Sequence, residues 1–74
     1  MSTQQLDWDA TRNRAQRMSL EALVYAISDC YSAAKSARLL EAFGGKVLKT
    51  EGYYMDELSV YRQELNRRRE SSIL

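Results

Sequence analysis

The sequence predicts an all-α protein in which two amphipathic helices, at about 19–43 and 51–69, form an antiparallel hairpin. Two observations favour this class. Apolar residues recur at steps of three and four in both segments. The chain has no proline, and the adjacent pair Gly44 and Gly45 falls between the two segments. At 74 residues the chain makes one small domain.

Residues 1–18 are predicted to be a polar N-terminal arm that forms either a short helix or an extended segment. Trp8 is its most informative residue, because a solvated indole leaves a large apolar surface in water. Trp8 either packs against its own domain or anchors into a partner or a second copy, since Trp is enriched among residues that dominate binding.

The first helix is predicted to begin at Ser19, whose hydroxyl can cap a free backbone N–H in the first turn. Met18 and Leu23 stand at the positions of a hydrophobic staple. At 100° per residue, the apolar residues that we expect to face the core lie on one stripe of this helix. Its members are Leu20, Leu23, Val24, Ile27, Tyr31 and Ala34.

Leu39, Leu40 and Phe43 would lie on the other side of this helix if it continued unbroken. Either the helix ends or kinks near Ser36 to Arg38, or one long helix carries two apolar faces. No helix breaker occurs before Gly44, so we expect a helix that continues to about Phe43. The three residues then form a predicted contact surface.

The second helix is predicted from about Glu51 to Arg69, with Thr50 as its cap and residues 70–74 as a frayed end. Glu64 can pair with Arg68 at the i, i+4 spacing. The expected core stripe is Tyr54, Leu58, Tyr61 and Leu65, widened by Met55. The expected solvent side is Asp56, Glu57, Gln63, Glu64, Asn66 and Arg67.

Residues 19–69 resemble a group of short bacteriophage and prophage-encoded α-helical proteins of uncharacterised function. The resemblance lies in Ser19-Leu20, Tyr25-Ala26-Ile27-Ser28-Asp29, Gly52-Tyr53-Tyr54-Met55-Asp56-Glu57-Leu58 and Arg67-Arg68-Arg69. It implies a helical hairpin with a variable link, and it implies no activity, cofactor or site residue.

The composition excludes several kinds of chemistry. With no His and a single Cys, the chain cannot form an internal disulfide, a His-based catalytic site or the usual zinc cage. Cys30 lies mid-helix without an activating base, so we expect a small buried apolar residue. Asp56 and Glu57 are adjacent and point about 100° apart on a helix. We therefore predict no enzyme activity, no metal and no cofactor.

Self-association is the partner interaction that the composition favours. Only fifteen of the 74 residues are Leu, Ile, Val or Phe, and chains below about 70–80 residues rarely hold a stable core without a disulfide, a metal or a partner. We therefore predict a homo-oligomer, with a dimer as the first expectation. The predicted contact residues are Trp8, Tyr25, Leu39, Leu40, Phe43 and Tyr53, and Asp29 is a candidate for a polar contact across the interface.

Nucleic-acid binding is the alternative. It would use the C-terminal basic cluster of Arg62, Arg67, Arg68 and Arg69, although the formal net charge is only +1 and no known nucleic-acid-binding motif is present. No stretch approaches the length and apolarity of a membrane span, and the single thiol favours a cytoplasmic location.

Overall fold

The structure, a computed structural model, describes residues 5–47 and 49–73 and confirms the all-α class. Three helices are present, α1 (Trp8–Arg17), α2 (Leu20–Ala42) and α3 (Glu51–Ile73), and these residues contain no strand. The sequence predicts two main helices and leaves the form of the arm open. Residues 8–17 of the arm are helical, so the fold has a third element.

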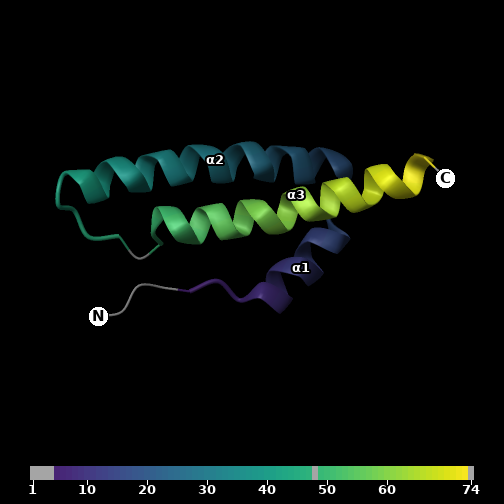
Figure 1. Ribbon diagram of the computed structural model, residues 1–74, viewed down its shortest axis with the longest axis horizontal. Coiled ribbons are helices and arrows are strands. Elements are labelled where there is room, and N and C mark those ends of the chain that lie inside the picture. The colour runs from purple at the N-terminus through teal and green to yellow at the C-terminus, as the bar shows by residue number, and fades with distance from the viewer. Residues whose placement is uncertain (1–4, 48, 74) are drawn as a thin grey trace.

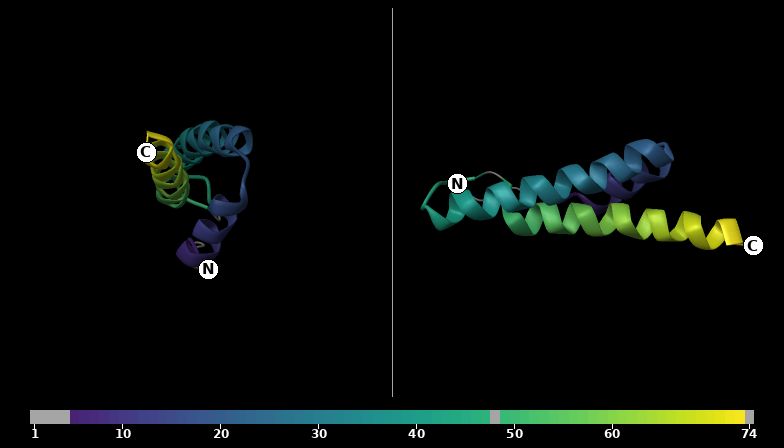
Figure 2. Two further views of the ribbon diagram at one scale, coloured as in Figure 1. Left: turned by 90° about the vertical axis from the view of Figure 1, so that its right-hand side faces the viewer. Right: turned by 90° about the horizontal axis from the view of Figure 1, so that it is seen from above.

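The long helices α2 and α3 lie side by side and run in opposite directions, and the short α1 crosses α3 obliquely (Figures 1 and 2). Viewed along the long axis, α1 lies to one side of the α2–α3 pair, and none of the described residues forms a helix over the other side (Figure 2). The molecule measures 48 × 21 × 15 Å. A shape this thin can bury few side chains completely.

Local sequence signals set both ends of α2. The Ser19 hydroxyl accepts the backbone N–H of Ala22 at 3.1 Å, as the cap prediction requires. The helix runs without a break to Ala42, so the alternative of a kink near Ser36 does not apply. Gly44 has a φ of +80°, and its neighbour Gly45 donates its N–H to the carbonyl of Leu40 at 2.8 Å. This is the Schellman arrangement, which Gly favours because it lacks a Cβ.

Helix α3 begins where the sequence predicts and ends later. The Thr50 hydroxyl accepts the N–H of Tyr53 at 3.2 Å, which caps the first turn. The predicted end at Arg69 is too early, because α3 continues to Ile73. No Gly or Pro follows Arg69, so nothing in the sequence interrupts the helix there. Leu74 lies outside the described residues.

The predicted core stripe of α2 is rotated in the structure. The residues that α3 covers are Leu23, Cys30, Ala34 and Ala37, which follow a seven-residue repeat. Leu20, Val24 and Tyr31 are more than half exposed, so their assignment to the core is wrong. The physical reason is that three small residues let α3 approach that side of α2 closely, whereas the bulkier stripe lies beside the contact.

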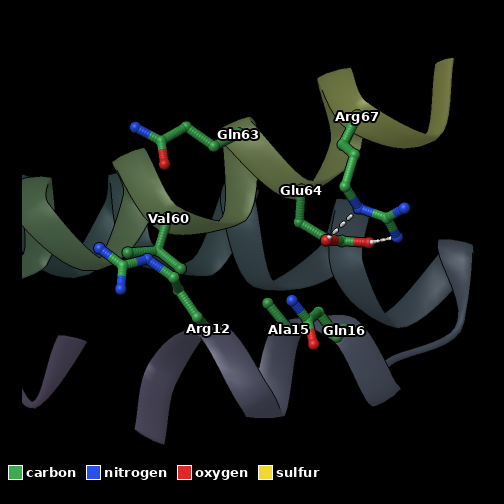
Figure 3. Close-up of a pocket in the computed structure, with 7 residues that line it drawn as sticks. All are labelled: Arg12, Ala15, Gln16, Val60, Gln63, Glu64 and Arg67. Carbon is green, nitrogen blue, oxygen red and sulfur yellow. Dashed lines mark hydrogen bonds and ion pairs between the residues drawn. The ribbon is translucent and has the colours of Figure 1, made fainter. Parts of the chain in front are cut away.

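The buried residues of α3 fall into two groups, one in the core cluster with α2 and one beneath α1. Leu58 and Tyr61 are buried as predicted, and Leu65 packs partly against the same cluster. Val60 and Glu64 are also buried, although the sequence places Glu64 in solvent. The pocket that Val60 and Glu64 line also holds Arg12, Ala15 and Gln16 of α1 (Figure 3). Helix α1 therefore covers a side of α3 that periodicity alone assigns to water.

Glu64 and Arg68 fasten the end of α1 to α3. Both oxygens of Glu64 accept hydrogen bonds from Arg67, at 3.0 and 2.6 Å, and Oε2 also accepts Arg68 Nε at 2.7 Å (Figure 3 shows the Arg67 bonds). The other end of the Arg68 guanidinium donates to the carbonyls of Ala15 and Met18 at 3.0 and 2.7 Å. These carbonyls lie at the negative end of α1, where a cation is favoured.

We expect Glu64→Gln to lower the free energy of unfolding by about 1.5–3 kcal/mol, because it replaces charge-assisted hydrogen bonds of a buried carboxylate. Chemical denaturation followed by circular dichroism measures this loss. Glu70→Gln is the matched control, since it neutralises an exposed carboxylate on the same helix and should change stability by less than about 0.5 kcal/mol. Equal losses in the two variants would contradict the role of Glu64.

The same carboxylate should make stability depend on acid pH. Hydrogen bonds from Arg67 and then Arg68 lower the pKa of Glu64 from 4.5 to about 2. A lowered folded-state pKa contributes stability that is present above about pH 4.5 and is lost as the pH falls towards 2. We therefore expect the melting temperature of Glu64→Gln to fall less than that of the native protein over this range. Parallel curves for the two proteins would refute the assignment.

Candidate interaction surfaces

The predicted contact residues of α2 lie in solvent. Tyr25 is 75% exposed and Phe43, at the end of α2, is 87% exposed, while Leu39 and Leu40 are each 53% exposed. Tyr25 and Phe43 are 18 residues apart, which is five full turns, so they point in the same direction. Both point away from the stripe that α3 covers. We call this side of α2, which includes Tyr25, Leu40 and Phe43, the outer flank.

A shallow groove borders the outer flank near the end of α2. Leu40 forms part of its wall, and Val47 and Tyr54 lie across from α2. The complete lining is Ala33, Ser36, Ala37, Leu40, Val47, Lys49 and Tyr54. The small residues of α2 leave the floor of this groove open, so the apolar surface continues from the outer flank towards the start of α3.

Trp8 and Tyr53 lie together on a different part of the molecule. They line one groove between the segment before α1 and the start of α3, together with Leu6 and Thr50. Trp8 is 41% exposed, so part of the indole is covered by its own chain. Lys49 lies 5.1 Å from the centre of the Tyr53 ring, within the range of a cation–π contact. The structure therefore divides the predicted contact residues between two surfaces.

A third apolar surface was missed because its residues were assigned to the core. We call it the open face: it is the side of the α2–α3 pair opposite α1, with Leu20, Val24 and Tyr31 on α2 and Met55 on α3. The signal in the sequence that points to this face is the small-residue repeat of Cys30, Ala34 and Ala37, which competes with the bulkier stripe for the contact with α3.

The C-terminal arginines do not form one basic patch. Arg67 and Arg68 are held by Glu64, and Arg68 also binds the end of α1. Arg62 and Arg69 are exposed, and neither has an ion pair within the described residues. Two of the four residues predicted to contact nucleic acid therefore have an internal structural role.

A polar cluster joins the three helices near the middle of the molecule. Arg14 of α1 donates to the Tyr61 hydroxyl at 2.7 Å and to Glu57 at 3.0 Å, and Tyr61 donates to Glu57 at 2.8 Å. Burial, then the neighbouring Glu57, raises the pKa of both Cys30 and Tyr61 to about 12. At neutral pH the thiol and the phenol are protonated, so this cluster presents no thiolate or phenolate nucleophile.

Two further features bear on the kind of site. In the described part of the chain, no three His, Cys, Asp or Glu residues come together as a candidate metal site. Over the same residues, no helix combines the length and the apolarity that crossing a membrane requires.

Comparison with known proteins adds no relative to this picture. No protein-family model, no curated protein and no solved structure matches the chain.

Proposed function

We propose that this protein is a non-enzymatic interaction module that self-associates through α2, with the antiparallel pair of α2 and α3 as the unit that packs into an oligomeric helical bundle. The lone thiol fits a cytoplasmic location for such a module. The resemblance to short phage-encoded helical proteins supplies no activity, so the proposal rests on the surface of the helices.

The observation that carries the proposal is the exposure of α2. Six of its large apolar side chains, Leu20, Val24, Tyr25, Tyr31, Leu39 and Leu40, are each more than half exposed. Single exposed apolar residues are normal, but a cluster on one element indicates a contact surface. Helix α2 meets one neighbour along one stripe, which leaves most of its circumference available to a partner.

The small core supports the same conclusion. Among the described residues, four large apolar side chains are buried: Leu23, Leu58, Val60 and Tyr61. Burial of one large apolar side chain contributes about 1.5–3 kcal/mol, so four such residues leave little stabilisation to offset the entropy of ordering the chain. Association of two chains would bury part of this exposed apolar surface and so add to the free energy of unfolding.

Size-exclusion chromatography with light scattering tests the proposal on the full chain. We expect a mass of at least twice 8.6 kDa, and a melting temperature that rises with protein concentration, because association stabilises the folded state by mass action. A folded species of 8.6 kDa whose melting temperature is unaffected by dilution would refute self-association.

Nucleic-acid binding remains the second candidate, on a changed set of residues. The exposed cations of the open face are Lys35 and Arg38 on α2 and Arg62 and Arg69 on α3, and none of them has an ion pair within the described residues. Tyr31 lies on the same face and offers a ring for stacking on a base.

This candidate predicts binding that weakens steeply with salt, because each phosphate contact releases counterions. A mobility-shift assay at low salt with single- and double-stranded probes measures it. Arg62→Gln should weaken binding and reduce the salt slope by about 1, whereas Arg17→Gln, which removes an exposed cation from α1, should have no effect. Absence of any shift at low salt would remove this candidate.

A further inference from the structure

We infer that two copies of the chain pair antiparallel along the outer flank of α2, with Tyr25 of each copy packed against Leu40 of the other. This inference rests on the proposed function, because it names the surface and the geometry through which the chain self-associates. It concerns a side of α2 whose residues are exposed in the single chain.

The outer flank has the periodicity of a helix–helix contact. Its residues follow one another at steps of three, four and seven, which keeps them on one side of a helix. They are Ala22, Tyr25, Asp29, Ser36, Leu40 and Phe43, and every one of them is exposed. Tyr25 and Phe43 are the two most exposed large apolar residues in the described chain.

The spacing along this flank is the same from either end. The intervals from Ala22 to Phe43 are three, four, seven, four and three residues. An antiparallel pair with a two-fold axis between Ser32 and Ala33 therefore makes every contact twice, as an isologous interface requires.

The residues that this symmetry brings together are complementary. Phe43 of one copy lies over Ala22 of the other, so a large side chain meets a small one. Tyr25 meets Leu40, which buries two apolar surfaces. The carboxylate of Asp29 comes within reach of the Ser36 hydroxyl, which can donate to it. At the centre, Ser32 and Ala33 are small enough for the two backbones to approach closely.

Charge favours the antiparallel direction. The positive N-terminal end of each α2 lies beside the negative C-terminal end of the other. Glu21 at the first end and Lys46 just beyond the second are exposed, and neither has an ion pair within the described residues. The same symmetry places Glu21 of one copy at the level of Gly44 of the other, two residues from Lys46, where opposite charges attract.

The open face is less suited to a second copy. Arg62 lies at the midpoint of α3 on that face, and Lys35 and Arg38 lie on α2 beside it. Two open faces packed around a central two-fold axis would bring arginine against arginine, which is unfavourable in an interface that excludes water. The outer flank has no cation among its six contact residues.

A matched pair of tyrosine variants tests the surface. Tyr25→Asp puts a charge on the outer flank, and Tyr31→Asp puts the same charge on the open face of the same helix, where the ring is 63% exposed. By light scattering and sedimentation, we expect Tyr25→Asp to raise the dissociation constant of the dimer at least about 10-fold. Tyr31→Asp should leave it unchanged, and circular dichroism checks that both variants fold. The opposite result would overturn the inference.

Cysteine pairs test the direction without removing any large side chain. Asp29→Cys and Ser36→Cys chains are mixed under mild oxidation, and a covalent dimer with one chain of each kind is expected. Neither variant alone should form a disulfide-linked dimer. In the antiparallel pair, two copies of residue 29 are separated by about 10 Å along the axis, beyond the reach of a disulfide. Cys30 needs no replacement, since its thiol is buried and the native protein serves as the blank.

The two measurements separate this inference from the proposed function. A dimeric mass without the mixed disulfide would overturn the outer-flank pairing and leave self-association intact. Cross-linking of each variant with itself would indicate a parallel pair and would also overturn the inference. A monomeric native protein would refute the proposed function, and the inference with it.

Discussion

The contact between α2 and α3 constrains everything else in this molecule. It runs along a stripe in which one large residue, Leu23, is followed by the small residues Cys30, Ala34 and Ala37. Small side chains let two helices approach closely, but each contributes little apolar area to the contact. The contact therefore aligns two helices of 23 residues each while it buries few large side chains, and it leaves the bulkier apolar residues of α2 outside the pair.

Helix α1 is held by a different kind of interaction. Ala15 is its buried apolar contact, and the rest of its attachment is polar: Arg68 binds its last carbonyls, and Arg14 joins Glu57 and Tyr61. Such contacts require particular distances and directions, so they orient α1 on α3. A buried ion pair adds little net stability over an apolar contact of the same size, because its charges must leave water. The polar contacts thus orient α1, but they do not make up for the small stabilisation that the core provides.

These two features together explain why a chain of this size presents so much apolar surface. Helix α1 covers one side of the α2–α3 pair, and its polar attachment takes up Arg67 and Arg68. The outer flank and the open face of α2 stay uncovered, and they differ in charge. The open face carries cations, whereas the outer flank carries one carboxylate among small and aromatic residues. That difference, together with the symmetric spacing of the flank, is the basis on which we propose a second copy as the partner of the outer flank.

The sequence by itself determined the helical class, both ends of α2 and the start of α3, because a cap involves residues only three to five positions apart: Ser19 with Ala22, Thr50 with Tyr53, and Gly45 with Leu40. It also identified Tyr25, Leu40 and Phe43 as surface residues, since they fall off the expected stripe. Only the tertiary structure decided which side of α2 is buried and that Glu64 lies in the interior. Helical periodicity describes one helix at a time, and it contains no information on which neighbour covers which side. Helix α2 has two apolar stripes, and α3 packs against the one with small residues. Glu64 can be buried where α1 crosses α3 because arginines from its own helix neutralise its charge.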